Sequence, residues 1–216
     1  IAHEIRNPLS TINHASQLLA ESENIDGADQ RLLQMIENQA ARLNNIVSNV
    51  LDISRRQVAN PQKVDIEQCL TRIKSQVEET RKVQLQIDYQ FSPSPFIVSF
   101  DESQLNQVLY NLIDNAIIHS AKNTQQYWVG IHGFMKDNRP CITLHDKGLG
   151  IKPDDVEKVF EPFYTTNPNG SGLGLYICRE LCEMNQALLD YLYDDDGEGY
   201  FQIHFAHINR RLTLSE

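Results

Sequence analysis

Two asparagines four residues apart give the first chemical signal in this chain. Asn111 and Asn115 lie in the stretch ESQLNQVLYNLIDNAIIHS, and their spacing places both carboxamides on one face of a helix. Carboxamide oxygens suit a hard cation such as Mg²⁺, which takes one or two protein ligands and keeps most of its waters. Taken alone, the pair favours the alternative, two asparagines on a solvated helix surface.

A turn at the end of a strand gives the second signal. The stretch DKGLG follows the apolar run CITLH directly, so Asp146 is expected at a strand end. Gly148 and Gly150 let the backbone turn sharply and approach a ligand closely. A turn of this composition is also a common loop that binds nothing.

Glycines just before a predicted helix give the third signal. The stretch NGSGLGL places Gly170, Gly172 and Gly174 at the start of a helix expected over about 173–185. Backbone N–H groups at the positive end of a helix can hold phosphates without help from lysine. By itself, a glycine-rich turn is not specific for nucleotides.

The fourth signal is the opening stretch IAHEIRNPLS, which sets His3, Glu4 and Asn7 at the start of an apolar-periodic segment. Pro8 lacks a backbone N–H and should bend a helix beside His3. In isolation, the stretch favours an exposed helical histidine next to a proline.

The segment that carries His3 is predicted to be a helical hairpin. Apolar positions recur at helical spacing on both sides of the polar break ESENIDGADQ. They are Ile5, Leu9, Ile12 and Leu19 before the break, and Leu32, Ile36, Ala40, Leu43, Val47, Val50 and Ser54 after it. A lone hairpin cannot bury both apolar faces, so we expect a homodimer whose hairpins form a four-helix bundle.

The other three signals belong to a second region, which begins after the polar, proline-bearing stretch RRQVANPQKVD. Helices are predicted over about 66–81 and 102–120, the second with Asp101 as its N-cap. Strands are predicted over 83–91, 95–100, 127–134, 141–146, 188–193 and 200–206. This order predicts an α+β fold in which helices cover one face of a mixed sheet.

Composition excludes several classes of protein. The 216 residues carry a formal net charge of −10, and without a basic patch a nucleic-acid surface is not expected. No apolar run approaches the ~18 residues of a membrane span, and no signal-peptide layout opens the chain, so we expect a cytoplasmic fragment. Because the first residue is not Met, we expect it to be the C-terminal part of a longer protein. The four scattered cysteines favour buried thiols over a metal site.

In this order, HEIRNP, NLIDNA, DKGLG, FEPFYTT and GSGLGL match the signature blocks of two-component sensor histidine kinases. The chain resembles that family from His3 to about Phe205. The resemblance implies a dimerisation and histidine-phosphotransfer hairpin over 1–57, a linker over 58–63, a catalytic domain over 64–208 and a tail over 209–216. The catalytic domain would be an α/β sandwich of the gyrase, chaperone and histidine-kinase type. The stretches GLGLYICRELCEMNQALLDY and FAH are similar to the sensor kinases that control type IV pilus expression.

The resemblance assigns His3 as the residue phosphorylated by ATP. Phosphoryl transfer to histidine needs a neutral imidazole nitrogen with a free lone pair, and Glu4 would fix the proton on the other ring nitrogen. By the family's pattern, Asn7 would position a water that dephosphorylates a partner protein.

The resemblance also assigns the site for ATP and Mg²⁺. Asn115 is expected to bind Mg²⁺, and Asp146 to accept a hydrogen bond from the adenine amino group. Related ATP-hydrolysing machines have a glutamate where this chain has Asn111, which cannot act as the base that activates water. The residues expected to shape the pocket and its phosphate lid are Gly148, Gly150, Thr165, Thr166, Gly170, Ser171, Gly172, Leu173 and Gly174. The mobile lid itself is expected over Thr165 to Ser171.

Two positions depart from the family pattern. Ile118 and Asn167 stand where the family often has lysines that touch phosphate. We expect compensation by other cations, for which Lys122, Lys147 and Arg179 are the candidates.

The expected partner is the receiver domain of a response regulator, whose aspartate takes the phosphoryl group from His3. For the pilus-type kinases this partner would be a transcription activator. The full-length protein is expected on the cytoplasmic face of the bacterial inner membrane, anchored by segments upstream.

Two alternatives remain, an ATP-driven conformational machine and a dimeric scaffold with impaired nucleotide binding. His3 and Asn111 count against the machine. The scaffold is favoured only by Ile118 and Asn167.

Overall fold

The structure is a computed structural model that describes residues 11–12, 14, 16, 29–36, 39–40, 43, 58–167 and 170–207, except the side chain of Lys122. Contacts divide the chain into two compact units. One comprises residues 1–57 and 161–173, and the other comprises residues 58–160 and 174–216.

In the first unit, every described residue before position 44 is helical. The exposed large apolar side chains among them are those of Ile12, Leu32, Met35, Ile36 and Leu43. Four of these five belong to the predicted apolar seam, and a single copy of the chain leaves them in solvent.

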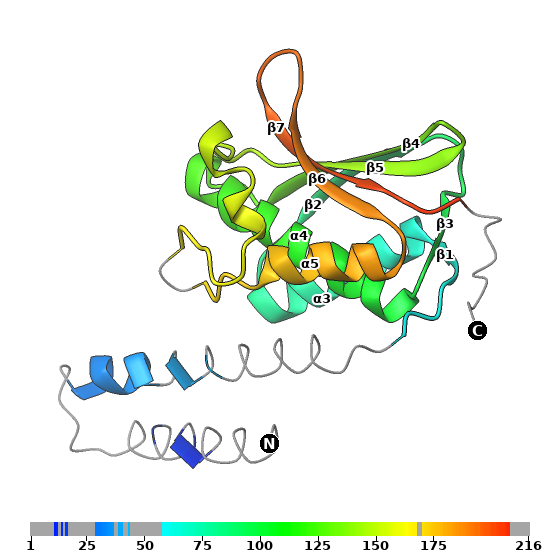
Figure 1. Ribbon diagram of the computed structural model, residues 1–216. Helices are drawn as coiled ribbons and strands as arrows, with labels where there is room; N and C mark the ends of the chain where they lie inside the picture. Colours follow the sequence, from blue (N-terminus) through cyan, green and yellow to red (C-terminus); the bar gives the residue numbers. More distant parts are fainter. Residues whose placement is uncertain are drawn as a thin grey trace. The chain divides into compact units, whose positions relative to one another are not determined.

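The second unit contains a five-stranded mixed sheet with the strand order β2-β4-β5-β7-β6 (Figure 1). Strand β2 runs parallel to β4, and the other neighbouring strands are antiparallel. The strands are β2 (Gln86–Phe91), β4 (Trp128–Lys136), β5 (Arg139–His145), β6 (Leu188–Tyr193) and β7 (Gly199–His204).

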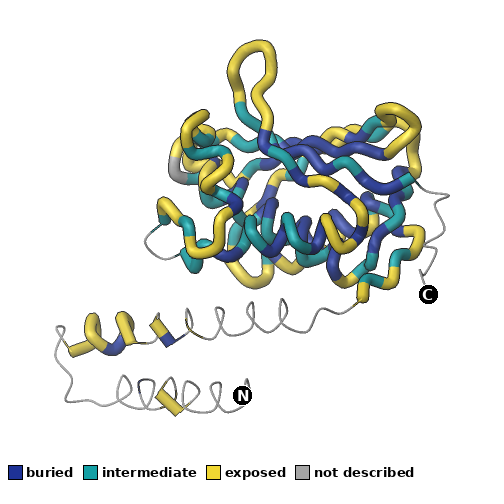
Figure 2. Tube along the Cα trace, viewed as in Figure 1, coloured by how far each residue is buried: buried dark blue, intermediate teal, exposed yellow. Residues whose placement is uncertain are grey.

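Three helices cover one face of this sheet, namely α3 (Ile66–Arg81), α4 (Glu102–Thr124) and α5 (Gly174–Met184) (Figure 1). Buried residues are concentrated in the strands and along these helices (Figure 2). The sheet contributes to the core from alternate positions, including Val129, Ile131, Ile142, Leu144, Leu189, Phe201 and Ile203. The predicted two-layer α/β sandwich is therefore confirmed.

The second unit also contains a small two-stranded sheet. Strand β1 (Gln62–Asp65) pairs antiparallel with β3 (Ile97–Phe100), with Val64 opposite Val98. The sequence places Gln62 and Lys63 in the linker, but both belong to β1. Their strand conformation comes from pairing with a segment more than 30 residues away, which no local pattern reveals.

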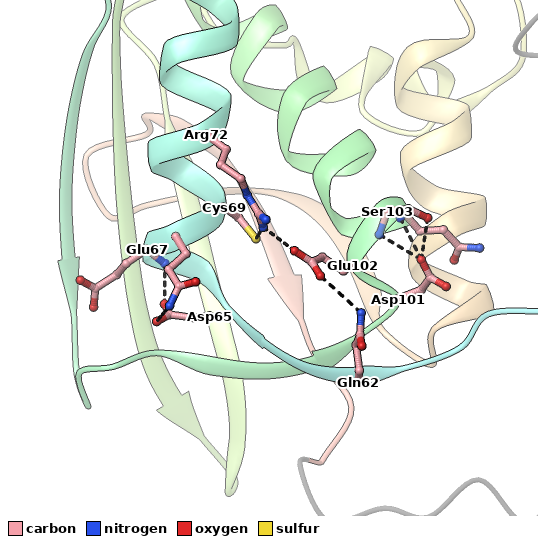
Figure 3. Close-up of polar contacts among 10 residues, drawn as sticks. Gln62, Asp65, Glu67, Cys69, Arg72, Asp101, Glu102 and Ser103 are labelled. Carbon is pink, nitrogen blue, oxygen red and sulfur yellow. Dashed lines mark hydrogen bonds and ion pairs between the residues drawn. The ribbon is translucent and has the colours of Figure 1, made fainter.

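Two aspartates begin the helices α3 and α4 (Figure 3). Asp65 Oδ1 accepts a hydrogen bond from the Glu67 N–H at 2.9 Å. Asp101 Oδ1 accepts from the N–H groups of Ser103 and Gln104 at 3.0 and 3.2 Å. Each carboxylate satisfies N–H groups that have no partner within the helix. The predicted N-cap at Asp101 is confirmed.

Two short 3₁₀ helices, η1 (Pro153–Asp155) and η2 (Lys158–Phe160), follow β5. All four cysteines are free and buried, as predicted. The described residues form no cluster of three or more His, Cys, Asp and Glu side chains that could hold a metal ion. Nor does any helix in the described part of the chain have the length and apolar character needed to cross a membrane.

Candidate functional site

Helix α4 presents the two asparagines that the sequence singles out, and both are half-buried. The Asn111 side chain forms a hydrogen bond with the Cys178 thiol. Burial raises the pKa of this thiol to about 12. In contrast, the Asn115 carboxamide makes no hydrogen bond to any described residue. A half-buried polar group without a partner is the kind of atom that a ligand satisfies. Asn115 therefore fits the predicted role of a metal ligand.

Asp146 follows β5 directly, as predicted, and is half-buried. Its Oδ1 accepts a hydrogen bond from the Gly148 N–H at 2.6 Å. Burial raises the pKa of Asp146, although the Gly148 N–H and the nearby His119 act in the opposite direction. No described residue donates a hydrogen bond to Oδ2, so one carboxylate oxygen can accept from a ligand such as an amino group.

The turn that holds Asp146 depends on its glycines. A Cβ on Gly148 would lie 2.9 Å from the Cβ of His119, closer than side chains pack. Gly150 has φ of +70°, a conformation that side chains other than glycine rarely adopt. Beyond the turn, the hydroxyl of Tyr191 accepts a hydrogen bond from the Ile151 N–H at 3.0 Å, which fixes the end of the turn to β6.

Helix α4 also fixes the Asp146 turn, through residues that sequence reasoning missed. Ser120 is fully buried, and its hydroxyl accepts from the Lys147 N–H at 2.8 Å and donates to the Trp128 carbonyl at 3.0 Å. Asn123 donates to the Lys147 carbonyl at 2.8 Å. The same helix thus carries Asn115 and positions the backbone next to Asp146. A buried serine one turn or more beyond the asparagines gives no local sequence signal.

The predicted lid, Thr165 to Ser171, lies within the segment 161–173, of which 168 and 169 are not described. Its ends are joined, because the Phe163 N–H donates to the Gly172 carbonyl at 2.9 Å. Gly172 has φ of +69°, and a Cβ there would overlap the Phe163 backbone. Within the segment, Thr165 Oγ1 accepts from the Asn167 N–H at 3.1 Å, and the Gly170 N–H donates to the Asn167 carbonyl at 2.8 Å.

The other predicted residues of this region are less constrained. Thr166 is exposed. The Ser171 hydroxyl accepts from the N–H of Leu173, whose side chain is buried. Gly174 begins α5, and nothing lies within 4 Å of a Cβ built there, so packing does not require glycine at that position.

The predicted phosphotransfer residues His3, Glu4 and Asn7 lie outside the described residues. Their roles stay predictions. Among the described residues, α4 carries Asn111 and Asn115 and, through Ser120 and Asn123, holds the turn of Asp146, Gly148 and Gly150.

Comparison with known families covers most of the chain. Residues 1–58 match the His Kinase A (phospho-acceptor) domain. Residues 100–207 match the family described as histidine kinase-, DNA gyrase B-, and HSP90-like ATPase. The chain belongs to the sensor histidine kinases.

Two curated relatives place this kinase more closely. It is 43% identical over 209 residues to the sensor protein kinase PilS of Pseudomonas aeruginosa, an alignment that covers 96% of this chain and 39% of the relative. It is 34% identical over 190 residues to the sensor histidine kinase ZraS of Salmonella typhi, with 86% and 40% covered. The chain thus spans about 40% of the length of these relatives.

Solved structures of histidine kinases share the fold. A mycobacterial sensor histidine kinase, MprB, is similar with a TM-score of 0.56 and 26% identity, over 68% of this chain and 97% of that one. The complex of histidine kinase ThkA with response regulator protein TrrA contains a similar chain, with a TM-score of 0.68 and 24% identity, over 97% of this chain and 61% of that one.

Two of the cations expected to compensate for Ile118 and Asn167 are engaged elsewhere in this kinase. Lys147 Nζ donates to Gln126 Oε1 at 3.1 Å and lies 4.7 Å from the centre of the Trp128 ring. The guanidinium of Arg179 lies 5.0 Å from the Phe160 ring and 3.8 Å from carboxylates of Glu157 and Glu183. The contacts of Lys147 and Arg179 do not favour a phosphate-binding role for either residue. The side chain of the third candidate, Lys122, is not described.

Proposed function

We propose that this chain is the catalytic core of a sensor histidine kinase that phosphorylates His3 from Mg-ATP and passes the phosphoryl group to a response regulator. The observation that carries the proposal is a pair of acceptors without a partner among the described residues, the Asn115 carboxamide and Asp146 Oδ2. They belong to a domain of an ATPase family, in a chain whose first residues match a phospho-acceptor domain.

Each site residue has a defined chemical task in this proposal. Asp146 accepts a hydrogen bond from the adenine amino group and thereby selects the base. Asn115 binds Mg²⁺, which neutralises charge on the phosphates of ATP. The glycines of the 165–174 region allow backbone N–H groups to approach the phosphates.

The transfer itself takes place at His3. A neutral imidazole nitrogen attacks the γ-phosphorus in line, a bond from nitrogen to phosphorus forms, and the bond to the β-γ bridging oxygen breaks to release ADP. Glu4 accepts a hydrogen bond from the N–H of the His3 ring. This fixes the proton on that nitrogen and leaves the lone pair of the other, attacking nitrogen free. Since Asn111 has no basic group, it does not activate water, which favours transfer to histidine over hydrolysis.

The phosphoryl group then moves from His3 to an aspartate carboxylate of a receiver domain. The complex of the related ThkA with its regulator TrrA supports a partner of this kind. In the reverse direction of signalling, Asn7 positions a water that dephosphorylates the regulator. The 43% identity to PilS supports a regulator of type IV pilus expression, a transcription activator.

The exposed apolar side chains of the hairpin region support a homodimer. Ile12, Leu32, Ile36 and Leu43 recur along the predicted seam and remain in solvent in one chain. A second copy would bury them in a four-helix bundle. The resemblance to sensor kinases supports anchoring of the full-length protein at the inner membrane, with this part on the cytoplasmic side.

The test is incubation of the chain with Mg²⁺ and ATP radiolabelled in its γ-phosphate. We expect label that is labile in acid and stable in base, and that a response-regulator receiver domain then removes. His3→Gln should abolish the label, and Asn115→Ala should reduce it by about 100-fold or more. Failure of the wild-type chain to bind any nucleotide would leave a scaffold as the function. Label that survives in His3→Gln would show that another residue accepts the phosphoryl group.

A further inference from the structure

An ion pair joins the end of α3 to the part of α4 that carries the two asparagines. Arg81 is the last residue of α3, and its Nε donates to Asp114 Oδ1 at 2.6 Å while its Nη2 donates to Asp114 Oδ2 at 2.7 Å. Both carboxylate oxygens are therefore engaged by one guanidinium in a bidentate arrangement. The Asp114 side chain is only 21% exposed and the Arg81 side chain 37% exposed.

Asp114 occupies a position where a free carboxylate would interfere with the proposed site. It lies three residues after Asn111, on the same helix face, and directly precedes Asn115, which puts it about 100° around the helix from Asn115. A carboxylate is a stronger ligand for Mg²⁺ than a carboxamide and repels phosphate. Asn115 has no described partner, whereas its charged neighbour is fully engaged.

We propose that Arg81 is a positioning residue that holds the Asp114 carboxylate away from the bound metal and phosphates. This inference rests on the proposed role of Asn115 as the Mg²⁺ ligand. The pair neutralises a negative charge beside the site in a chain whose net charge is already −10. It also leaves a single carboxamide as the protein's ligand from this part of α4, which suits a metal that must leave with the nucleotide.

The fold supplies a matched control between the same two helices. Arg72 of α3 pairs with Glu102 at the first turn of α4, with Nη2 2.6 Å from Oε1 (Figure 3). Glu102 precedes Asp114 by twelve positions, which is about 18 Å along the helix. Loss of either pair removes a partly exposed contact between α3 and α4, but only the Arg81 pair lies beside Asn115.

The experiment compares Arg81→Met with Arg72→Met, since Met keeps much of the aliphatic stem and removes the charge in both. Binding of the fluorescent analogue trinitrophenyl-ATP is measured without Mg²⁺ and across a Mg²⁺ titration, and melting is followed with Mg²⁺ alone. Without Mg²⁺, Arg81→Met should weaken nucleotide binding about three- to tenfold, because a free carboxylate faces the phosphates. This loss should shrink at high salt. With Mg²⁺ alone, the variant should gain thermal stabilisation that the wild type and Arg72→Met lack.

Asp114→Asn provides the opposite change and a test of mechanism. It frees the Arg81 cation without exposing a carboxylate, so nucleotide binding should be unchanged or tighter. The double variant Arg81→Met with Asp114→Asn should return to within about twofold of the wild type, because the repelling charge is absent.

Two outcomes separate this inference from the proposed function. If the wild type and Arg72→Met bind nucleotide with Mg²⁺, and Arg81→Met behaves as Arg72→Met does, the pair is only a structural contact and the inference is wrong. If the wild type binds no nucleotide under any condition, the proposed function is wrong and the inference falls with it.

Discussion

The first turn of α4 and its middle differ in how their polar groups are hydrogen-bonded. At the first turn, Asp101 accepts hydrogen bonds from α4 and also from the Asn60 N–H at 3.1 Å. Asn185, which is 2% exposed, accepts from the Asp101 N–H at 2.8 Å and donates to Gln104 Oε1 at 2.6 Å. Farther along the helix, Asn115 has no described partner, and neither does Oδ2 of Asp146 beside the helix.

This contrast separates groups that specify the fold from groups that await a ligand. A buried polar network is stable when each member is satisfied, because an unpaired buried group loses its hydrogen bonds to water. Half-buried acceptors without partners carry the same cost in milder form until a ligand binds. The first turn of α4 is thus built for stability, and its middle is built for binding.

The largest expected effect on nucleotide binding comes from Asp146→Asn, which neutralises the carboxylate. The asparagine can still accept from the Gly148 N–H, but replacing the carboxylate weakens or removes the bond to the adenine amino group. We expect nucleotide affinity to fall about 10- to 100-fold, the equivalent of about 1–3 kcal/mol. Titration with trinitrophenyl-ATP checks this, and Asp190→Asn on β6 is the control for the loss of one negative charge.

The same variant should be more stable without nucleotide. Burial raises the pKa of Asp146, so the folded protein holds this proton up to a higher pH than the unfolded chain does. Stability is therefore lost as the pH rises from the ordinary carboxyl pKa through the raised one, and an asparagine avoids that loss. A lower melting temperature for Asp146→Asn at neutral pH would contradict the view that this carboxylate is kept for binding.

The largest expected effect on stability comes from Asn185→Ala, which breaks the buried hydrogen-bond network at the first turn of α4. The change leaves the Asp101 N–H and Gln104 Oε1 without their buried partner and also removes the bond to the Leu181 carbonyl. The free energy of unfolding should fall by about 2–4 kcal/mol. Urea denaturation measures it, and nucleotide affinity under conditions where the variant is folded should match the wild type.

Asn123→Ala is the matched control for this change. It removes an exposed asparagine whose side chain makes one hydrogen bond among the described residues, to the Lys147 carbonyl, so its cost should stay below about 1 kcal/mol. Equal losses of stability in the two variants would mean that the buried network contributes no more than a surface hydrogen bond.

Local sequence signals predicted most of the elements but not the network. Helix α3 spans the predicted residues 66–81, and Asp101 caps α4, because apolar periodicity and capping are properties of neighbouring residues. The hydrogen bond between Asn185 and Asp101 joins residues 84 positions apart, and the pair of Arg81 and Asp114 spans 33 positions. Such contacts depend on the packing of α3, α4 and α5, which no short stretch encodes.

In the candidate site, too, local motifs were predicted and long-range contacts were not. Asn115 and Asp146 were predicted because their motifs are local, and each has an acceptor that no described residue engages. Ser120 was missed, although it holds the Asp146 turn to α4, since a single serine in a helix has no distinguishing pattern. The expected compensation by Lys147 and Arg179 also depended on contacts that only the fold reveals.

The smallest expected effect is the change in stability with pH that comes from Asp101, at the first turn of α4. Burial alone would raise the pKa of Asp101, but hydrogen bonds from Ser103, Asn60 and Gln104 outweigh it and hold the pKa below its usual value. Its contribution to stability is therefore present above the ordinary carboxyl pKa and lost as the pH falls through the lowered one. This sign is opposite to that of Asp146.

Asp101→Asn tests that sign, because asparagine is as good an N-cap as aspartate but carries no charge. At pH 7 the variant should be less stable than the wild type by about 0.3–1 kcal/mol, the value of a negative charge at a helix N-terminus. The difference should shrink as the pH falls below the ordinary carboxyl pKa and vanish once the wild-type carboxylate is protonated. A difference that persists unchanged in acid would mean that cap geometry, and not charge, stabilises this end of α4. In that case the first turn of α4 and its middle would differ only in how many of their polar groups are hydrogen-bonded. The opposite effects of pH on Asp101 and Asp146 would then not distinguish the two regions.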